Sequence, residues 1–146
     1  MRIYLDSCCY NRPYDDQTQI SISLEAQAKL HIQGLIQKNK FELVTSYMLR
    51  YECSQNPFEM RREAIFQFIE KHTGAYVGMG RKREIEMEAE KIMATGVKFK
   101  DACHVASALL AGCDYFISTD KRLLKYKTDR LKLVTPIEFL AELEGM

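Results

Sequence analysis

The sequence contains no apolar run approaching the ~20 residues that a membrane-spanning helix needs, so we expect no membrane contact. Its N-terminus lacks the basic-then-apolar pattern of a secretory signal, because Asp6 interrupts the first apolar run almost at once. None of the five cysteines shows the paired spacing of a zinc ribbon or a redox CxxC motif. These absences favour a cytoplasmic protein with reduced thiols.

A strong net charge is also missing. The formal net charge is +1, so the whole molecule exerts no general attraction on nucleic acid. Basic residues are nevertheless clustered at 61–62, 81–83 and 121–132. Two interpretations stay open: these clusters are solvated helix faces, or some of them flank an acidic pocket and attract phosphates.

Several catalytic motifs are absent as well. The sequence has no GxSxG nucleophile elbow and no phosphate-binding loop with its lysine. No GxGxxG follows the first predicted strand, because Gly78 and Gly80 lack the rest of that fingerprint. The chain therefore lacks the motifs of serine hydrolases, of P-loop nucleoside triphosphatases and of dinucleotide-binding proteins.

The 146 residues fit one domain spanning 1–146, without an internal repeat or a linker. Apolar runs that predict strands alternate with amphipathic segments that predict helices. The predicted strands are Arg2 to Leu5, Phe41 to Thr45, Tyr115 to Ser118 and Leu131 to Val134, and Ala75 to Val77 is either a fifth strand or an extended connection. The predicted helices are Ser23 to Lys38, Tyr47 to Cys53, Pro57 to His72, Arg83 to Thr95, Lys100 to Ala111, a turn at Lys121 to Tyr126, and a last helix from Pro136. This alternation predicts an α/β fold with a parallel or mostly parallel sheet covered on both faces.

Four acidic residues stand out by their position in this pattern. Asp6 and Asp120 directly follow predicted strands, and Glu52 lies just beyond the strand that ends at Thr45. Asp101 opens a helix whose N-terminus should lie at the carboxyl edge of the sheet, because the helix leads into a parallel strand. Ligands bind at that edge in open α/β sheets, so we expect the acids to converge there.

Each acid also has a simpler explanation when it is considered alone. Asp6 or Asp120 would cap a turn, and Asp101 would interact favourably with its helix dipole. Glu52 would pair with a nearby base such as Arg50. Convergence of several carboxylates, however, creates repulsion that a cation such as Mg²⁺ or Mn²⁺ relieves, and such ions catalyse phosphodiester hydrolysis.

Three sequence segments resemble the motifs of PIN-domain nucleases. They are Leu5-Asp6-Ser7-Cys8-Cys9-Tyr10-Asn11-Arg12-Pro13-Tyr14-Asp15, then residues 100–108 (KDACHVASA), and residues 117–124 (ISTDKRLL). The segments occur in the family's order, and the similarity covers essentially the whole chain. The acids of the family's motifs fall on Asp6, Glu52, Asp101 and Asp120.

This resemblance implies a PIN-like three-layer α/β/α fold with a central parallel sheet of four or five strands. It also implies an endoribonuclease that depends on Mg²⁺ or Mn²⁺, with the four acids as metal ligands or, for Glu52, as the group that orients the attacking water. Compact members are often toxins of VapC type that an antitoxin protein inhibits. Many of these toxins carry Asn where this chain has Cys8, and that departure weakens the toxin assignment specifically.

Supporting roles fall to three neighbours of the acids. The hydroxyls of Ser7 and Thr119 would hydrogen-bond the carboxylates or a phosphate, or would cap turns. Arg12 would bind phosphate, or would be a solvent-exposed arginine.

Other functions and sites stay open at this level. The protein could be a catalytically silent PIN-like module that binds metal or a partner. A phosphoryl-accepting receiver is disfavoured, because the strand ending at Thr45 carries no aspartate. Zinc bound by Cys8, Cys53, Cys103 and His104 matches no known spacing, and buried thiols explain these cysteines better. The segment from Ser23 to Lys38 would either form a homodimer face or simply cover the sheet.

Overall fold

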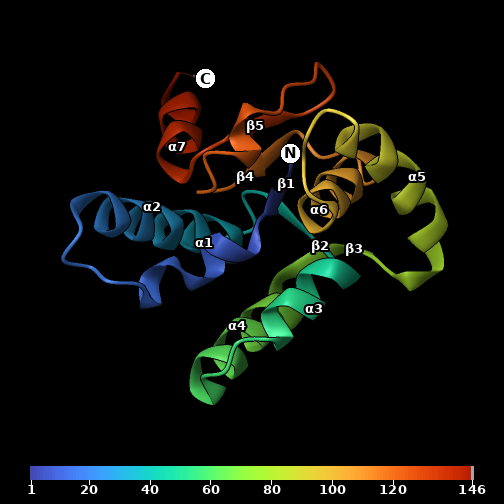
Figure 1. Cartoon of the computed structure of the whole chain (residues 1–146). Helices are drawn as coiled ribbons and strands as arrows, with labels where there is room; N and C mark the ends of the chain where they lie inside the picture. The colour runs from blue at the N-terminus through green and yellow to red at the C-terminus, as the bar shows by residue number, and fades with distance from the viewer. Residues whose placement is uncertain (146) are drawn as a thin grey trace.

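A computed structural model describes residues 1–145 and contains a five-stranded parallel sheet in the order β3-β2-β1-β4-β5 (Figure 1). The strands are β1 (Arg2–Leu5), β2 (Glu42–Ser46), β3 (Thr73–Val77), β4 (Tyr115–Ile117) and β5 (Lys132–Val134). The α/β class and the parallel sheet are therefore confirmed. The segment left open around Ala75 is the fifth strand, at the edge of the sheet.

Helices cover both faces of the sheet and complete the three-layer arrangement (Figure 1). The α-helices are α1 (Ser7–Asn11), α2 (Ile20–Gln37), α3 (Tyr47–Ser54), α4 (Glu59–His72), α5 (Lys82–Met93), α6 (Phe99–Leu110) and α7 (Pro136–Glu144). Short 3₁₀ turns are η1 (Arg12–Tyr14), η2 (Met79–Arg81) and η3 (Leu123–Lys125). Helices α2 and α7 pack together on one face, and α5 and α6 pack together on the other. Within residues 1–145, no helix combines the length and apolarity needed to cross a membrane.

The central strand β1 shows why this sequence forms a covered parallel sheet. Ile3, Tyr4 and Leu5 are fully buried, and β1 pairs with β2 on one side and β4 on the other. A strand buried on both faces requires a continuous apolar run rather than alternation, which is the pattern found here. The core is continuous from β1 to helices such as α6, where Ala106 and Ala108 allow close packing.

The main difference from the predicted elements lies directly after β1. The predicted elements include no helix between the strand ending at Leu5 and the helix from Ser23, whereas the chain forms the short helix α1 and then the 3₁₀ turn η1. Asp6 caps α1 through its side chain, and Pro13 occupies the first turn of η1, where its missing N–H costs no hydrogen bond.

Element boundaries elsewhere agree with the expectations within a few residues. Ser46 is the N-cap of α3, and its Oγ accepts a hydrogen bond from the Leu49 N–H at 3.1 Å. Gly112 ends α6 with a φ of 68°, in the left-handed region that favours glycine. A single domain over 1–146 remains a prediction, and its last residue, Met146, lies outside the described residues.

The cysteines are free thiols, and they are mostly buried, as expected. Cys9, Cys53, Cys103 and Cys113 are buried, whereas Cys8 is partly exposed. Burial raises the pKa of Cys53 and of Cys113 to about 12, so both are inert apolar groups at neutral pH.

Candidate active site

Asp6 lies at the carboxyl end of the central strand and is held in one orientation. Its Oδ1 accepts a hydrogen bond from the Ser7 N–H at 2.8 Å, and its Oδ2 accepts one from the Ser118 hydroxyl at 2.8 Å. Only 4 % of its surface is exposed. The capping role considered for Asp6 is thus present, and its second oxygen is tied to the neighbouring strand end.

Asp120 follows β4, next to β1, and also fulfils the capping role considered for it. Its Oδ1 accepts hydrogen bonds from the N–H groups of Arg122 at 2.9 Å and Leu123 at 3.4 Å. The Asp120 N–H donates to the Ser118 hydroxyl oxygen at 3.0 Å. Since Ser118 also donates to Asp6, one buried serine links the loops that carry both aspartates. Sequence reasoning missed Ser118, although it directly precedes the Thr119-Asp120 pair.

Asp101 lies in the first turn of α6 and is half-buried. Burial and then the negative charges of Asp6 and Asp120 raise its pKa from 3.8 to about 6. The charge of Glu52 acts in the same direction, more weakly. The structure therefore places Asp6, Asp120 and Glu52 within electrostatic reach of Asp101, where their charges add to the effect of burial.

Glu52 reaches the same region from α3. Its Oε1 lies 2.5 Å from the His104 Nε2, and its Oε2 accepts a hydrogen bond from the Ser7 hydroxyl at 3.0 Å. Burial alone would raise the pKa of Glu52, but the hydrogen bonds and charge of His104, together with Ser7, hold it below its ordinary value. Burial likewise opposes the charged form of His104, yet the contact with Glu52 raises the pKa of His104 overall. The two side chains thus form a close hydrogen-bonded pair in which each shifts the pKa of the other toward its charged form.

This pair continues inward as a chain of buried hydrogen bonds. The His104 Nδ1 lies 2.6 Å from the Tyr4 hydroxyl, which lies 2.7 Å from the Ser46 hydroxyl. Both His104 and Tyr4 are fully buried. Because Ser46 caps α3, the chain ties Glu52 to the start of its own helix and to the central strand. Sequence reasoning did not find this role for His104, although its spacing three residues after Asp101 places both on one face of α6.

The three predicted supporting residues, Ser7, Thr119 and Arg12, make different contacts. The Ser7 hydroxyl binds a carboxylate, as one of its predicted roles requires. Arg12 instead forms ion pairs with Asp15 at 3.0 Å and Glu25 at 3.2 Å, so its guanidinium is engaged within the protein. Thr119 is buried, and its N–H lies 3.4 Å from the Cys8 Sγ.

Cys8 occupies the position where many VapC-type toxins carry asparagine. Its Sγ lies 3.5 Å from the Asp6 Oδ2 and 3.4 Å from the Ser118 hydroxyl oxygen. A thiol is a weak hydrogen-bond donor, so this contact constrains Asp6 less than an amide N–H would.

The possible metal ligands of this site are the four acids and the neighbouring cysteine and histidine side chains. Across residues 1–145, no group of three or more His, Cys, Asp and Glu side chains is arranged to hold a metal ion, and this includes the zinc set considered above. The acids are nevertheless oxygen donors, which suit Mg²⁺ and Mn²⁺, and Mg²⁺ usually keeps several waters and few direct protein ligands. The raised pKa of Asp101 marks an accumulation of negative charge that a cation would relieve. The oxygen chemistry of the four acids suits such an ion.

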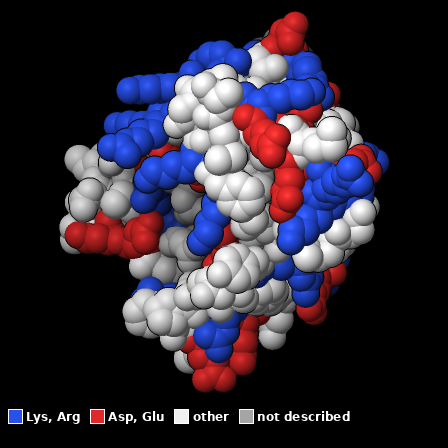
Figure 2. Space-filling view, turned by 45° about the vertical axis from the view of Figure 1, so that its right-hand side comes forward, with Lys and Arg blue, Asp and Glu red and all other residues white. Residues whose placement is uncertain are grey.

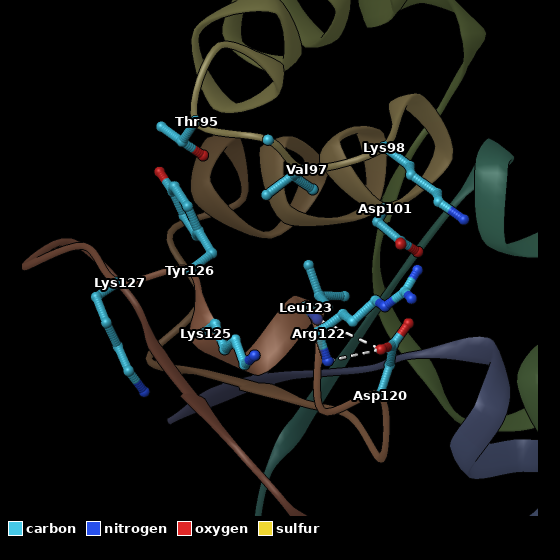
Figure 3. Close-up of a pocket in the computed structure, with 11 residues that line it drawn as sticks. Thr95, Val97, Lys98, Asp101, Asp120, Arg122, Leu123, Lys125, Tyr126 and Lys127 are labelled. Carbon is cyan, nitrogen blue, oxygen red and sulfur yellow. Dashed lines mark hydrogen bonds between the residues drawn. The ribbon is translucent and has the colours of Figure 1, made fainter.

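A pocket of about 580 Å³ opens beside two of the acids (Figure 3). It lies between the segment joining α5 to α6 and the segment from Asp120 to Lys127. Its lining comprises Thr95, Gly96, Val97, Lys98, Asp101, Asp120, Arg122, Leu123, Lys125, Tyr126 and Lys127. Figure 2 shows that Lys and Arg side chains gather on part of the molecular surface, interspersed with Asp and Glu. Arg122, Lys125 and Lys127 from the basic cluster 121–132 thus line the pocket that also contains Asp101 and Asp120.

No protein-family model matches the sequence, and no curated protein matches it either. The fold is similar to a chain of VapBC2 from Rickettsia felis, in a crystal structure bound to a DNA fragment from the promoter, at 10% identity and a TM-score of 0.55. That match covers 91% of this chain and 97% of the other. The fold is also similar to a chain of FitAcB from Neisseria gonorrhoeae, at 11% identity and a TM-score of 0.57, with 92% and 98% covered.

These similarities concern the fold, because the sequence identities are very low. Together with the observed sheet order, they support the PIN-like α/β fold that the motifs suggested.

Proposed function

We propose that this protein is a metal-dependent endoribonuclease that hydrolyses phosphodiester bonds with Mg²⁺ or Mn²⁺. The observation that carries the proposal is geometric: Ser118 links the loops of Asp6 and Asp120 at the carboxyl edge of the sheet, and Asp101 and Asp120 line one pocket beside it. The similarity of the fold to VapBC2 and FitAcB supports the same conclusion. A basic, partly aromatic pocket beside the acids supports a polyanionic substrate.

Asp6, Glu52, Asp101 and Asp120 would hold the ion, directly or through water. When bound, a divalent ion supplies an acidified water as nucleophile and stabilises negative charge on the leaving oxygen. The residues of the chain contribute positioning. Ser118 and the Ser7 N–H fix the orientation of Asp6.

Glu52 contributes a carboxylate that is kept ionised and correctly placed. His104 and the Ser7 hydroxyl bind its two oxygens, so the carboxylate cannot rotate freely. A carboxylate in this state accepts hydrogen bonds from water, which suits it to orient the attacking molecule. Arg12 stabilises the segment after α1 through its ion pairs.

An antitoxin is the protein partner that we infer for this chain. The similar chains come from the VapBC2 and FitAcB complexes, and a nuclease toxin requires an inhibitor during synthesis. Expression of the chain alone should arrest growth, and co-expression with its inhibitor should restore growth and abolish RNA cleavage. A homodimer is a further prediction, which light scattering on the purified protein tests.

The activity is tested by incubating labelled single-stranded RNA with purified protein and Mn²⁺. Wild-type protein should cleave the RNA, chelation should stop cleavage, and Asp6→Asn should lower the rate at least 100-fold, about 2.7 kcal/mol in the activation barrier. Asp129→Asn is the matched control, because Asp129 is an exposed aspartate outside the candidate site.

The controls separate this proposal from the alternative of a silent metal-binding module. Equal cleavage by wild type and Asp6→Asn would identify a contaminating nuclease and refute the assignment. Metal-dependent stabilisation without cleavage of any RNA would support the silent module instead.

A further inference from the structure

The pocket beside Asp101 and Asp120 has two chemically different ends (Figure 3). Asp101, Asp120 and the Arg122 side chain lie together at one end, whereas Thr95 and Tyr126 face each other at the other end. Val97 from the segment before α6 lines the pocket between the two ends. A molecule that fills the pocket would therefore meet the acids with one part and an aromatic ring with another.

The size and lining of the pocket fit one nucleotide. A volume of about 580 Å³ lies within the range of roughly 300–1,000 Å³ that small-ligand pockets have. The Tyr126 side chain is half-buried and packs against the core, and it also lines the pocket. Val97 and Leu123 add apolar surface, and Lys125 and Lys127 add positive charge.

We propose that this pocket binds one unpaired nucleotide of the RNA, next to the scissile phosphate, with its base stacked on Tyr126. This inference rests on the proposed nuclease function and assigns the substrate a position. The scissile phosphate lies at the end of the pocket that carries Asp101 and Asp120. The base of the adjacent nucleotide lies between Tyr126 and Val97, and Lys125 binds a flanking phosphate.

An unpaired nucleotide fits better than a duplex because of how the pocket is built. The side chains that would stack on the base lie in a hollow between two chain segments, so a base reaches them only when it leaves the helical stack. Stacking on an aromatic ring is available to every base, and it is the usual mode of recognition for single strands. The Thr95 and Tyr126 hydroxyls would then favour some bases over others by hydrogen bonding.

Binding is measured by fluorescence anisotropy with a labelled RNA hexamer and EDTA, so that no cleavage occurs. Tyr126→Leu should weaken binding by about 5- to 150-fold, the range reported for loss of one base–aromatic stack. Tyr126→Phe keeps the ring and should bind within about 3-fold of wild type. Tyr76→Leu is the matched control, because Tyr76 is an exposed tyrosine on β3 outside this pocket.

A second variant tests the phosphate contact independently of the ring. Lys125→Gln should reduce the slope of log K against log salt by about 0.7, the value for one phosphate contact on a single strand. Lys38→Gln, an exposed lysine at the end of α2, should leave the slope unchanged. Melting temperatures of all variants establish that they are folded.

The outcomes separate this inference from the proposed function. If wild-type protein cleaves RNA while Tyr126→Leu and Lys125→Gln bind RNA as wild type does, the nuclease stands and the subsite is refuted. If no RNA is cleaved but binding depends on Tyr126, the subsite stands and the nuclease is refuted. If AMP binds as tightly as the hexamer, the pocket belongs to a free nucleotide, which also overturns the inference.

Discussion

Replacement of Asp101 by asparagine should stabilise the folded protein while it weakens the proposed metal site. The pKa of Asp101 rises from 3.8 to about 6 because burial and neighbouring carboxylates disfavour its charged form. Since one pKa unit corresponds to about 1.4 kcal/mol, this difference corresponds to at most about 3 kcal/mol of destabilisation at neutral pH.

The expected gain is smaller than that upper limit. Asp101 is half-buried, so solvent screening reduces the contribution to roughly 1–2 kcal/mol. The variant also loses the favourable interaction between a negative charge and the start of α6, about 0.5 kcal/mol. The net prediction for Asp101→Asn is a stability gain of about 1 kcal/mol at pH 8, or roughly 3 °C in Tm for a domain of this size.

The sign of the pH dependence follows from the direction of the pKa change. The folded protein holds the Asp101 proton more tightly than the unfolded chain does. The stability that this difference contributes to the folded wild type is fully present below pH 3.8 and is lost as pH rises through about 6. The gain of the variant should therefore be near zero at pH 4, increase up to pH 7 and remain constant above it.

Urea denaturation in EDTA at pH 4, 6 and 8 measures this gain, with Asp129→Asn as a control that should show no comparable gain. Added Mn²⁺ should raise the Tm of wild type more than that of Asp101→Asn, because the variant lacks one of the converging charges. Equal or lower stability of Asp101→Asn at pH 8 would refute the argument that the four carboxylates repel one another in the folded protein.

Three further substitutions test the packing behind the site, each by urea denaturation at pH 7. His104→Leu should destabilise by about 3–5 kcal/mol, because it leaves Glu52 ionised without its buried partner; a loss under 1 kcal/mol would contradict the pairing. Ser46→Ala should destabilise by about 1–2 kcal/mol through loss of the cap on the Leu49 N–H, whereas an unchanged midpoint would show the cap to be dispensable. Gly112→Ala should destabilise by about 1 kcal/mol or more, because alanine is strained at a φ of 68°; a stabilised variant would contradict the left-handed geometry.

The arrangement of the sheet and most helices could be predicted from the sequence, because the relevant signals are local. Continuous apolar runs such as Arg2 to Leu5 require burial on both faces, and alternation with helices then requires a parallel sheet. Ser46 lies at a helix start and Gly112 lies just after a helix end, positions that suit the conformational preferences of serine and glycine. The short helix α1 was missed, since five residues carry too little periodicity to distinguish a helix from a turn.

The candidate site was predicted only in part. The positions of Asp6, Asp101 and Asp120 followed from chain direction, because strand ends and helix starts of a parallel sheet share one edge. The ion pair of Arg12 with Glu25 could not be predicted, since it depends on where α2 lies relative to η1.

The sequence by itself determined the order of the elements, the chemical type of the acids and the edge of the sheet to which they belong. Only the tertiary structure decided that His104 pairs with Glu52 and that Tyr126 lines a pocket beside Asp101. Residues 52 and 104 lie far apart in the chain, and their contact depends on how α3 and α6 pack across the sheet. Local preferences specify each helix, but the distance between two helix faces is set by the core that both of them cover.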